Sequence, residues 1–242
     1  MSRPIFITGT DTGVGKTVFT ALLARHLCSL EVNVKVLKPF CSGGREDVEI
    51  LAEACGFKGD QNEINPYFFS EPIAPFLAAK SAGKSITITD CLAKIDAFGL
   101  NADCSLIEGA GGLLSPLGEG FDLLTLAQRM GGEVILVAPN KIGVINQVLL
   151  NVNELLRSGV QLHCIVLMGI ERPDPSVTTN ADMIREMTNR ISVFELSWLG
   201  DDPVATSSLK KSYESCKKVL AAIVPPPYFP PPFDGKASSE AG

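Results

Sequence analysis

The sequence predicts an α/β protein built on a doubly wound, mostly parallel sheet. Short apolar segments that suit buried strands alternate with helical patterns of hydrophobic residues along the 242-residue chain. Parallel strands need long connections and bury both faces, so helices are expected on both sides of the sheet. A glycine-rich segment between the first strand and the first helix is typical of the same architecture. With 45% hydrophobic residues, the chain is predicted to form one domain over residues 1–224.

The expected elements alternate in a regular order. Strands are predicted at residues 5–8, 33–37, 105–108, 134–138, 162–167 and 192–196. Helices are predicted at residues 16–29, 48–54, 123–130, 145–157, 180–189 and 207–222. Because ligands bind at the carboxyl ends of parallel strands, the residues that follow each strand are the first candidates for function.

Two segments do not fit this alternation. The insertion at residues 60–98 holds Pro66, Pro72 and Pro75 with two helix-like stretches, and it either covers a substrate pocket or only fills space. Residues 225–242 form a proline-rich tail, which cannot continue a helix and is expected to be extended or disordered. The alternative for the tail is a docking ligand for an aromatic groove on another protein.

Composition argues against several classes of function. The chain carries 21 basic and 27 acidic side chains, and a net charge of −6 makes neither nucleic acid nor a membrane an expected partner. Its seven cysteines include no C-x-x-C pair, which argues against a disulfide framework or zinc site and favours a reducing, cytoplasmic location. The two histidines, His26 and His163, lie in structural patterns, so histidine-based catalysis is not expected.

The phosphate-binding segment reads ITGTDTGVGKT over residues 7–17. Gly13 and Gly15 permit unusual backbone angles and close approach, so successive amides are expected to surround the phosphates. Lys16 is predicted to neutralise the β and γ oxygens, and the Thr17 hydroxyl is predicted to bind Mg²⁺. The segment departs from G-x-x-x-x-G-K-T, because its first glycine, Gly9, comes one residue early. The sequence therefore predicts a P-loop NTPase type of fold that binds a nucleoside triphosphate.

Two carboxylates and a second lysine follow neighbouring strands. Glu108 ends an apolar strand and precedes a glycine-rich stretch, where a Mg²⁺ ligand is expected. Asp47 lies just beyond the second strand, where it is either a further ligand or a helix cap. Lys38 ends the second strand beside the phosphate loop and is either an anion-binding group or an ordinary surface lysine. Ser42 follows closely with a hydroxyl that suits a small substrate.

Together these motifs resemble the dethiobiotin synthetase family. The matching segments are GTDTGVGKT at residues 9–17, KPFCSG at 38–43, EGAGG at 108–112 and NKIGVIN at 140–146. They occur in the family's order, and the likeness spans about residues 4 to 200. The resemblance implies a ligase of biotin biosynthesis. In this family, ATP and Mg²⁺ drive closure of a cyclic urea from 7,8-diaminononanoate and CO₂ through a phosphorylated carbamate.

The resemblance also implies the role of each site residue. Lys16 and Lys38 would be catalytic, and the metal would be held by Thr17, Asp47 and Glu108. The ATP site would comprise Thr12, Gly13, Val14, Gly15, Lys16, Thr17, Val18, Asp47, Glu108, Gly109, Ala110, Gly111, Met168 and Gly169. The substrate site would comprise Thr12, Lys38, Ser42, Gly111, Gly112, Ile142, Gly143, Val144, Ile145 and Asn146, the last five through backbone amides at a helix start. Family members are typically homodimers with the substrate near the interface.

The chain departs from the family's pattern at two places. Gly13 stands where well-known relatives carry an acidic residue, and LMGI at residues 167–170 replaces an asparagine-aspartate pair that contacts the adenine amino group. The sequence therefore predicts that triphosphates other than ATP can also serve.

Three other functions compete with this interpretation. A partition or septum-site ATPase of the same loop class would act as a dimerising switch, but such proteins carry a lysine at the position of Asp11. A GTPase switch would need an aspartate where Gly143 stands. A non-catalytic interaction protein, acting through the proline-rich tail, would leave the lysines and carboxylates around the phosphate loop unexplained.

Overall fold

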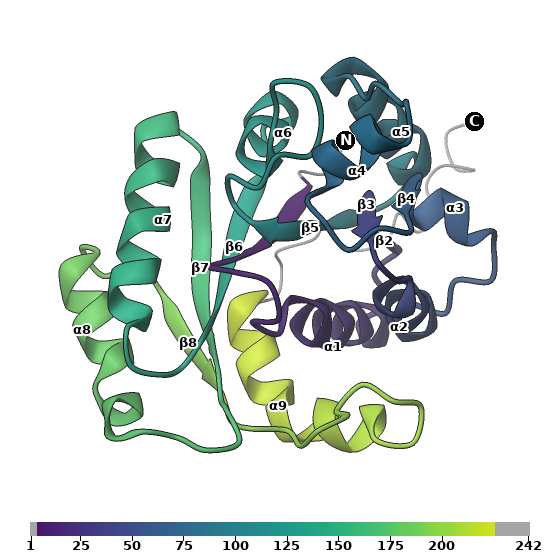
Figure 1. The fold of residues 1–242 in the computed structure, drawn as a ribbon. Coiled ribbons are helices and arrows are strands. Elements are labelled where there is room, and N and C mark those ends of the chain that lie inside the picture. The colour runs from purple at the N-terminus through teal and green to yellow at the C-terminus, as the bar shows by residue number, and fades with distance from the viewer. Residues whose placement is uncertain (1–3, 226–242) are drawn as a thin grey trace, which may run out of the picture.

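The computed structural model describes residues 4–225 and contains a six-stranded parallel sheet at its centre (Figure 1). The strand order is β2-β5-β1-β6-β7-β8, so β2 and β8 form the two edges. The strands are β1 Ile5–Gly9, β2 Val34–Leu37, β5 Cys104–Gly112, β6 Glu133–Pro139, β7 Gln161–Met168 and β8 Val193–Leu196. The predicted fold class and all six predicted strands are confirmed, although β5 runs four residues beyond Glu108.

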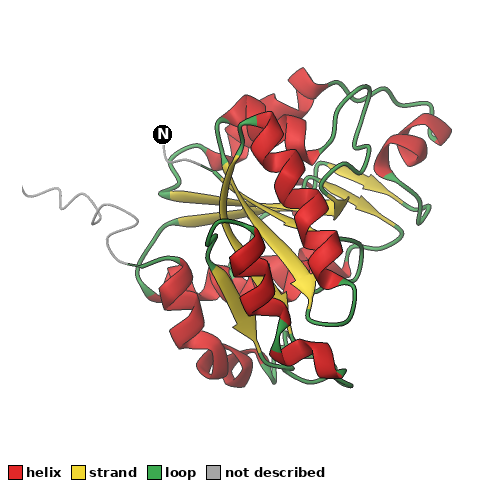
Figure 2. Ribbon diagram, turned by 90° about the vertical axis from the view of Figure 1, so that its left-hand side faces the viewer, coloured by secondary structure: helices red, strands yellow, loops and turns green. Residues whose placement is uncertain are grey.

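Helices cover both faces of this sheet (Figure 2). They are α1 Lys16–Ser29, α2 Glu46–Ala54, α3 Gln61–Ile64, α4 Pro75–Ser81, α5 Ile88–Gly99, α6 Leu123–Met130, α7 Val144–Ser158, α8 Asn180–Met187 and α9 Leu209–Ile223, with a 3₁₀ turn at Pro175–Thr178. The six helices predicted from the sequence are all present, with ends that differ by at most two residues. No helix within residues 4–225 is long and apolar enough to cross a membrane.

Alternating strand residues separate the hydrophobic core into layers. Ile135 and Val137 of β6 pack in the cluster that includes α1 and α9, whereas Leu136 and Ala138 pack with α7 and α8. Successive side chains of a strand point to opposite faces, and both faces of the central strands are buried, so these strands are mostly apolar. This explains why the strands appear in the sequence as continuous apolar runs.

The insertion at residues 60–98 contains α3, α4, α5 and a short strand, β4 Tyr67–Phe69. This strand pairs in parallel with β3 Phe40–Ser42 and forms a second, two-stranded sheet. The rings of Phe40 and Tyr67 stack with centroids 4.9 Å apart. This small sheet was not predicted from the sequence, because three-residue strands are too short to show a hydrophobic period.

Both histidines lie inside the described residues, whereas nearly all of the proline-rich tail lies outside them. His26 contacts the Tyr213 hydroxyl, and His163 contacts Glu133 and the Ile223 carbonyl, so both histidines lie in packing contacts of the fold. Residues 226–242, which hold nearly all of the proline-rich tail, lie outside the described residues.

Truncation of a central core residue tests the layered packing. We expect Leu136→Ala to lower the free energy of unfolding by about 2–5 kcal/mol, because Leu136 is fully buried and its loss leaves a cavity. Urea denaturation measures this change. Leu100→Ala, at a position 65% exposed, is the control and should change stability by less than about 0.5 kcal/mol. Equal effects at the two positions would contradict the described core.

Candidate active site

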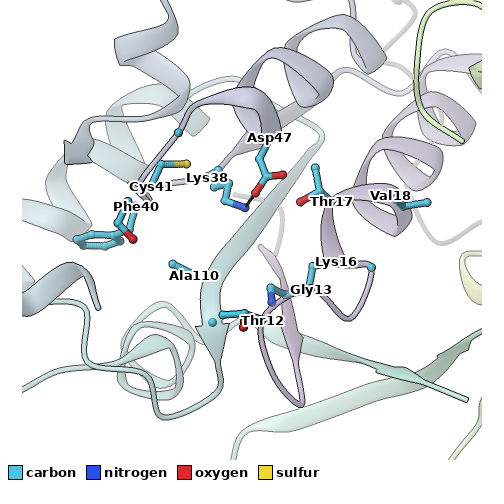
Figure 3. Close-up of a pocket in the computed structure, with 14 residues that line it drawn as sticks. Thr12, Gly13, Lys16, Thr17, Val18, Lys38, Phe40, Cys41, Asp47 and Ala110 are labelled. Atoms are coloured by element: carbon cyan, nitrogen blue, oxygen red, sulfur yellow. Dashed lines mark hydrogen bonds and ion pairs between the residues drawn. The ribbon is translucent and has the colours of Figure 1, made fainter. Parts of the chain in front are cut away.

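A cavity of about 360 Å³ opens where the phosphate loop meets the segments that follow β2 and β5 (Figure 3). Its lining comprises Thr12, Gly13, Gly15, Lys16, Thr17, Val18, Lys38, Phe40, Cys41, Ser42, Gly44, Asp47, Ala110 and Gly111. The cavity therefore lies at the carboxyl ends of parallel strands, where an open α/β sheet binds its ligands. Phe40, Cys41 and Gly44 line it as well, although these three residues were not among the predicted site residues.

The phosphate loop connects β1 to α1 through two left-handed glycines. Gly13 has φ of 69° and Gly15 has φ of 95°, a region that side chains with a Cβ rarely adopt. Lys16 Nζ donates to the Asp11 carbonyl oxygen at 2.8 Å across the loop. Burial lowers the pKa of Lys16 below its ordinary value, and the carboxylate of Glu108 partly offsets that effect.

Lys38 is buried at the centre of a network of charged side chains. Its Nζ donates to Glu108 Oε1 at 2.7 Å and forms a second ion pair with Asp47. Burial alone would lower the pKa of Lys38, but the carboxylates of Glu108 and Asp47 outweigh burial and raise it. Lys38 is therefore a charged, buried cation and not a surface lysine.

Glu108 connects the network to the phosphate loop. Its side chain is 0% exposed, and Oε1 accepts a hydrogen bond from the Thr17 hydroxyl at 2.7 Å. Asp47 lies in the first turn of α2, whose cap residue is Arg45, so the helix-cap interpretation of Asp47 is wrong. Four side chains from different segments thus meet here: Thr17 of α1, Lys38 after β2, Glu108 of β5 and Asp47 of α2.

The oxygen atoms of Thr17, Asp47 and Glu108 fit a magnesium ion. Glu108 Oε2 is buried and has no hydrogen-bond partner among residues 4–225, while the Asp47 side chain is 44% exposed. Within the same residues there is no cluster of three His, Cys, Asp or Glu side chains that suits a metal. One or two carboxylates with substrate phosphates and water are the usual Mg²⁺ environment, whereas zinc would need nitrogen or sulfur ligands.

The turn at residues 140–146 is not part of this cavity. Of its members proposed to bind substrate, Ile142, Gly143, Val144, Ile145 and Asn146, none lines it. Ile142 is 76% exposed, and its backbone amide donates to Asp174 Oδ2 at 2.8 Å. Gly109 and Gly112 do not line the cavity either, and the Gly112 amide donates to the Ser115 hydroxyl. The structure of one chain therefore brings together only part of the predicted substrate site.

A second cavity, of about 210 Å³, adjoins the outer side of the phosphate loop. Gly13, Gly15 and Val18 line both cavities, so a nucleotide with its phosphates in the first can extend into the second. The remaining lining residues are Val14, Pro139, Met168, Gly169, Ile170, Ser197, Trp198, Leu199, Gly200, Asp201 and Pro203. Met168 and Gly169 were predicted here, whereas Trp198 and its neighbours were missed, although they follow a predicted strand.

The first cavity also contains a thiol, that of Cys41, which was not predicted from the sequence to lie there. Burial raises the pKa of this thiol to about 12, so it is protonated at neutral pH. A protonated thiol is a weak nucleophile. Cys41 therefore serves as a small apolar wall beside Lys38.

Substitution of Gly15 tests the geometry of the phosphate loop. In Gly15→Ala, a new Cβ would have a φ of 95° and approach the Met168 side chain to 3.2 Å. We expect ADP affinity to fall at least about tenfold, because the loop amides must shift away from the phosphates. Isothermal titration calorimetry measures the affinity.

The matched control is Gly56→Ala, which has a φ of 68° but no neighbouring atom within 4 Å of the added Cβ. It should lose stability through the same backbone strain and retain ADP affinity. Equal ADP affinity in both variants would show that the loop geometry does not determine nucleotide binding.

Comparison with known proteins identifies the family. A family model described as an AAA domain matches residues 3–202. The ATP-dependent dethiobiotin synthetase of Bacillus subtilis strain 168 is 34% identical over 191 residues, which are 76% of this chain and 83% of that protein. The enzyme of the same name from Anaeromyxobacter dehalogenans is 36% identical over 205 residues, 82% of this chain and 92% of that protein.

Solved structures agree on the fold. The pNOB8 ParA protein bound to nonspecific DNA has a TM-score of 0.59 at 12% identity, covering 93% of this chain and 99% of ParA. The septum site-determining protein MinD of Pyrococcus horikoshii, complexed with Mg-ADP, has a TM-score of 0.58 at 15% identity, covering 92% of this chain and 96% of MinD. At such low identity these similarities establish only the P-loop NTPase fold. The much higher identity lies with the synthetases, and this chain belongs to the ATP-dependent dethiobiotin synthetase family.

Proposed function

We propose that this protein is an ATP-dependent dethiobiotin synthetase. It would close the ureido ring of dethiobiotin from 7,8-diaminononanoate and CO₂, and release ADP and phosphate. The observation that carries the proposal is that Lys16, Thr17 and Lys38 line one cavity beside the phosphate loop. The buried carboxylate of Glu108 accepts hydrogen bonds from both Thr17 and Lys38. The family relationship supports the same reaction.

The reaction proceeds in three bond-forming steps. One amine of the substrate attacks CO₂, forms a C–N bond and loses a proton to give a carbamate. A carbamate oxygen then attacks the γ-phosphorus of ATP, and ADP leaves. The second amine attacks the carbonyl carbon of this mixed anhydride and loses a proton, and phosphate leaves as the ring closes.

The two lysines supply electrostatic stabilisation in the phosphoryl-transfer step. Negative charge is shared by the carbamate and the transferring phosphoryl group, and both must approach each other closely. Lys16 lies in the phosphate loop, and the raised pKa of Lys38 keeps its ammonium group charged. No histidine base is needed, because the proton of the attacking amine can leave to water before phosphorylation. Ser42 and Thr12 line the same cavity and would contact the diamine.

We propose that Mg²⁺ is held by Thr17, Asp47 and Glu108 together with the ATP phosphates. When bound, the ion would neutralise charge on the β and γ oxygens. The buried, unpartnered Glu108 Oε2 supports this assignment.

We further propose a cytoplasmic homodimer. The turn at residues 142–146 does not line the cavity within one chain, and Ile142 is exposed. A second copy of the chain is therefore needed if this turn is to hold the substrate carboxylate beside the cavity. Neither nucleic acid nor a membrane is a proposed partner, in keeping with the acidic composition.

Substitution of Lys38 tests the proposed function. With ATP, Mg²⁺, bicarbonate and 7,8-diaminononanoate, we expect the wild type to form the cyclic urea and Lys38→Ala to lose at least about 100-fold in kcat, because one cation next to the developing charge is removed. Mass spectrometry quantifies the product, and circular dichroism checks that the variant is folded.

The matched control is Lys35→Ala, in β2, the strand that directly precedes Lys38. Lys35 Nζ lies over the Phe98 ring, 5.3 Å from its centroid, and does not line the cavity. Its removal should leave kcat within about twofold of the wild type. If ATP turnover instead responds to DNA or lipid and ignores the diamine with bicarbonate, the protein is a partition or septum-site type of ATPase.

Base selectivity is expected to be weak. The second cavity is lined mainly by apolar side chains and backbone. Met168 offers the adenine amino group only a weakly accepting thioether sulfur, and Gly169 offers no side chain. We therefore expect CTP to support turnover at a rate within about tenfold of that with ATP, measured by product formation at equal nucleotide concentration. Strict dependence on ATP would contradict this prediction.

A further inference from the structure

Asn65 is fully buried between α3 and β4, outside the cavity. Its Nδ2 lies 2.8 Å from the carbonyl oxygen of Lys38, 3.3 Å from that of Pro39 and 3.5 Å from that of Tyr67. Carbonyl oxygens only accept hydrogen bonds, so the atom among them must be the amide nitrogen. Asn65 therefore donates directly to the backbone of Lys38.

The same segment also holds the amide of Lys38. Lys38 N donates to the Ile64 carbonyl at 3.1 Å, and Tyr67 N donates to the Pro39 carbonyl at 3.0 Å. The strand that precedes Lys38, β2, is an edge strand whose paired register ends at Leu37. Among residues 4–225, no strand of the central sheet lies on the outer side of Lys38, and residues 64–67 take that place.

This segment is itself fixed at its start. Asp60 caps α3, accepting from the Asn62 amide at 2.9 Å, while the Asp60 amide donates to Glu63. Arg45 Nη2 donates to Asn62 Oδ1 at 2.8 Å and so joins α3 to the start of α2, which carries Asp47. Residues 60–67, the supporting segment, thus contact both the backbone of Lys38 and the helix of its ion-pair partner.

We propose that Asn65 is a positioning residue for Lys38, and that the supporting segment belongs to the active-site scaffold. The inference rests on the proposed function for its catalytic consequence. A shift of the Lys38 backbone would displace Nζ from its 2.7 Å contact with Glu108, and misplacement by about 1 Å of a catalytic group can reduce a rate strongly. Residues 60–67 of the insertion then neither cover a substrate pocket nor only fill space.

Hydrogen exchange tests the structural half of the proposal without any turnover. We expect Asn65→Ala to speed amide exchange at least about tenfold in a peptide spanning residues 36–42, because the Lys38 carbonyl loses its Asn65 donor and the Pro39 carbonyl keeps only the Tyr67 amide. Peptides from β1 and α1 should be unchanged. Asn65→Ser, a smaller change, is measured alongside.

Kinetics test the catalytic half. In Asn65→Ala, kcat for cyclic urea formation should fall at least about tenfold, while the dissociation constant of ADP stays within about twofold, because the phosphate loop is untouched. The control is Ile184→Ala, a fully buried position in α8 away from the cavity, assayed well below its melting temperature. This variant should lose stability but keep kcat.

The outcomes separate the two proposals. Unchanged exchange at residues 36–42, or a loss of kcat that Ile184→Ala reproduces, would overturn the assignment of Asn65. A loss of ADP affinity as large as the loss of kcat in Asn65→Ala would overturn the assignment as well. Failure of both Asn65 variants to fold would also overturn it, because Asn65 would then be required for the fold itself. If the wild type forms no cyclic urea, the proposed function fails, and hydrogen exchange still decides whether Asn65 holds Lys38.

Discussion

The buried ion pair between Lys38 and Glu108 determines how the active site is organised. A carboxylate that is 0% exposed is very costly unless a cation and hydrogen-bond donors compensate its charge. Lys38 Nζ and the Thr17 hydroxyl both bind Glu108 Oε1 at 2.7 Å. Loss of either contact would leave a buried charge partly uncompensated. The positions of α1, β2 and β5 at the cavity are therefore coupled through one carboxylate oxygen.

The register of the parallel sheet makes this pair possible. Ile7 of β1 pairs with Glu108 of β5, and Leu37 of β2 pairs with Ile107 of β5. Lys38, one residue beyond Leu37, thus leaves its strand next to Glu108. In parallel strands the equivalent ends lie at the same edge of the sheet, so the phosphate loop after β1 meets both groups there. A shift of β2 by one residue would turn its side chains to the other face and separate the pair.

Local sequence patterns predicted the strands, the helices and the phosphate loop. The six strands and six helices have apolar periods long enough to recognise, and the phosphate loop has a specific spacing. Trp198 could not be placed, because only folding brings the loop after β8 beside Met168 and the phosphate loop. Asn65 gives no local signal either, since its role depends on carbonyl groups 26 and 27 residues away. The turn near Ile142 was correctly expected at a helix start. Its position outside the cavity depends on how the chain folds, so local sequence could not predict it.

The charge balance of the site explains why lysines alone are insufficient for the proposed reaction. Lys16 and Lys38 face Asp47 and Glu108, so the two cations are matched by two carboxylates before any ligand binds. A triphosphate and a carbamate would add several negative charges to a cavity with no surplus of positive charge. At short range in a partly buried site, such repulsion is weakly screened. A divalent ion on Thr17, Asp47 and Glu108 would turn the two carboxylates from repelling groups into ligands, and Lys38 would then be free to balance the carbamate. The same carboxylates that keep Lys38 charged in the buried site therefore provide the physical reason for the proposed magnesium requirement.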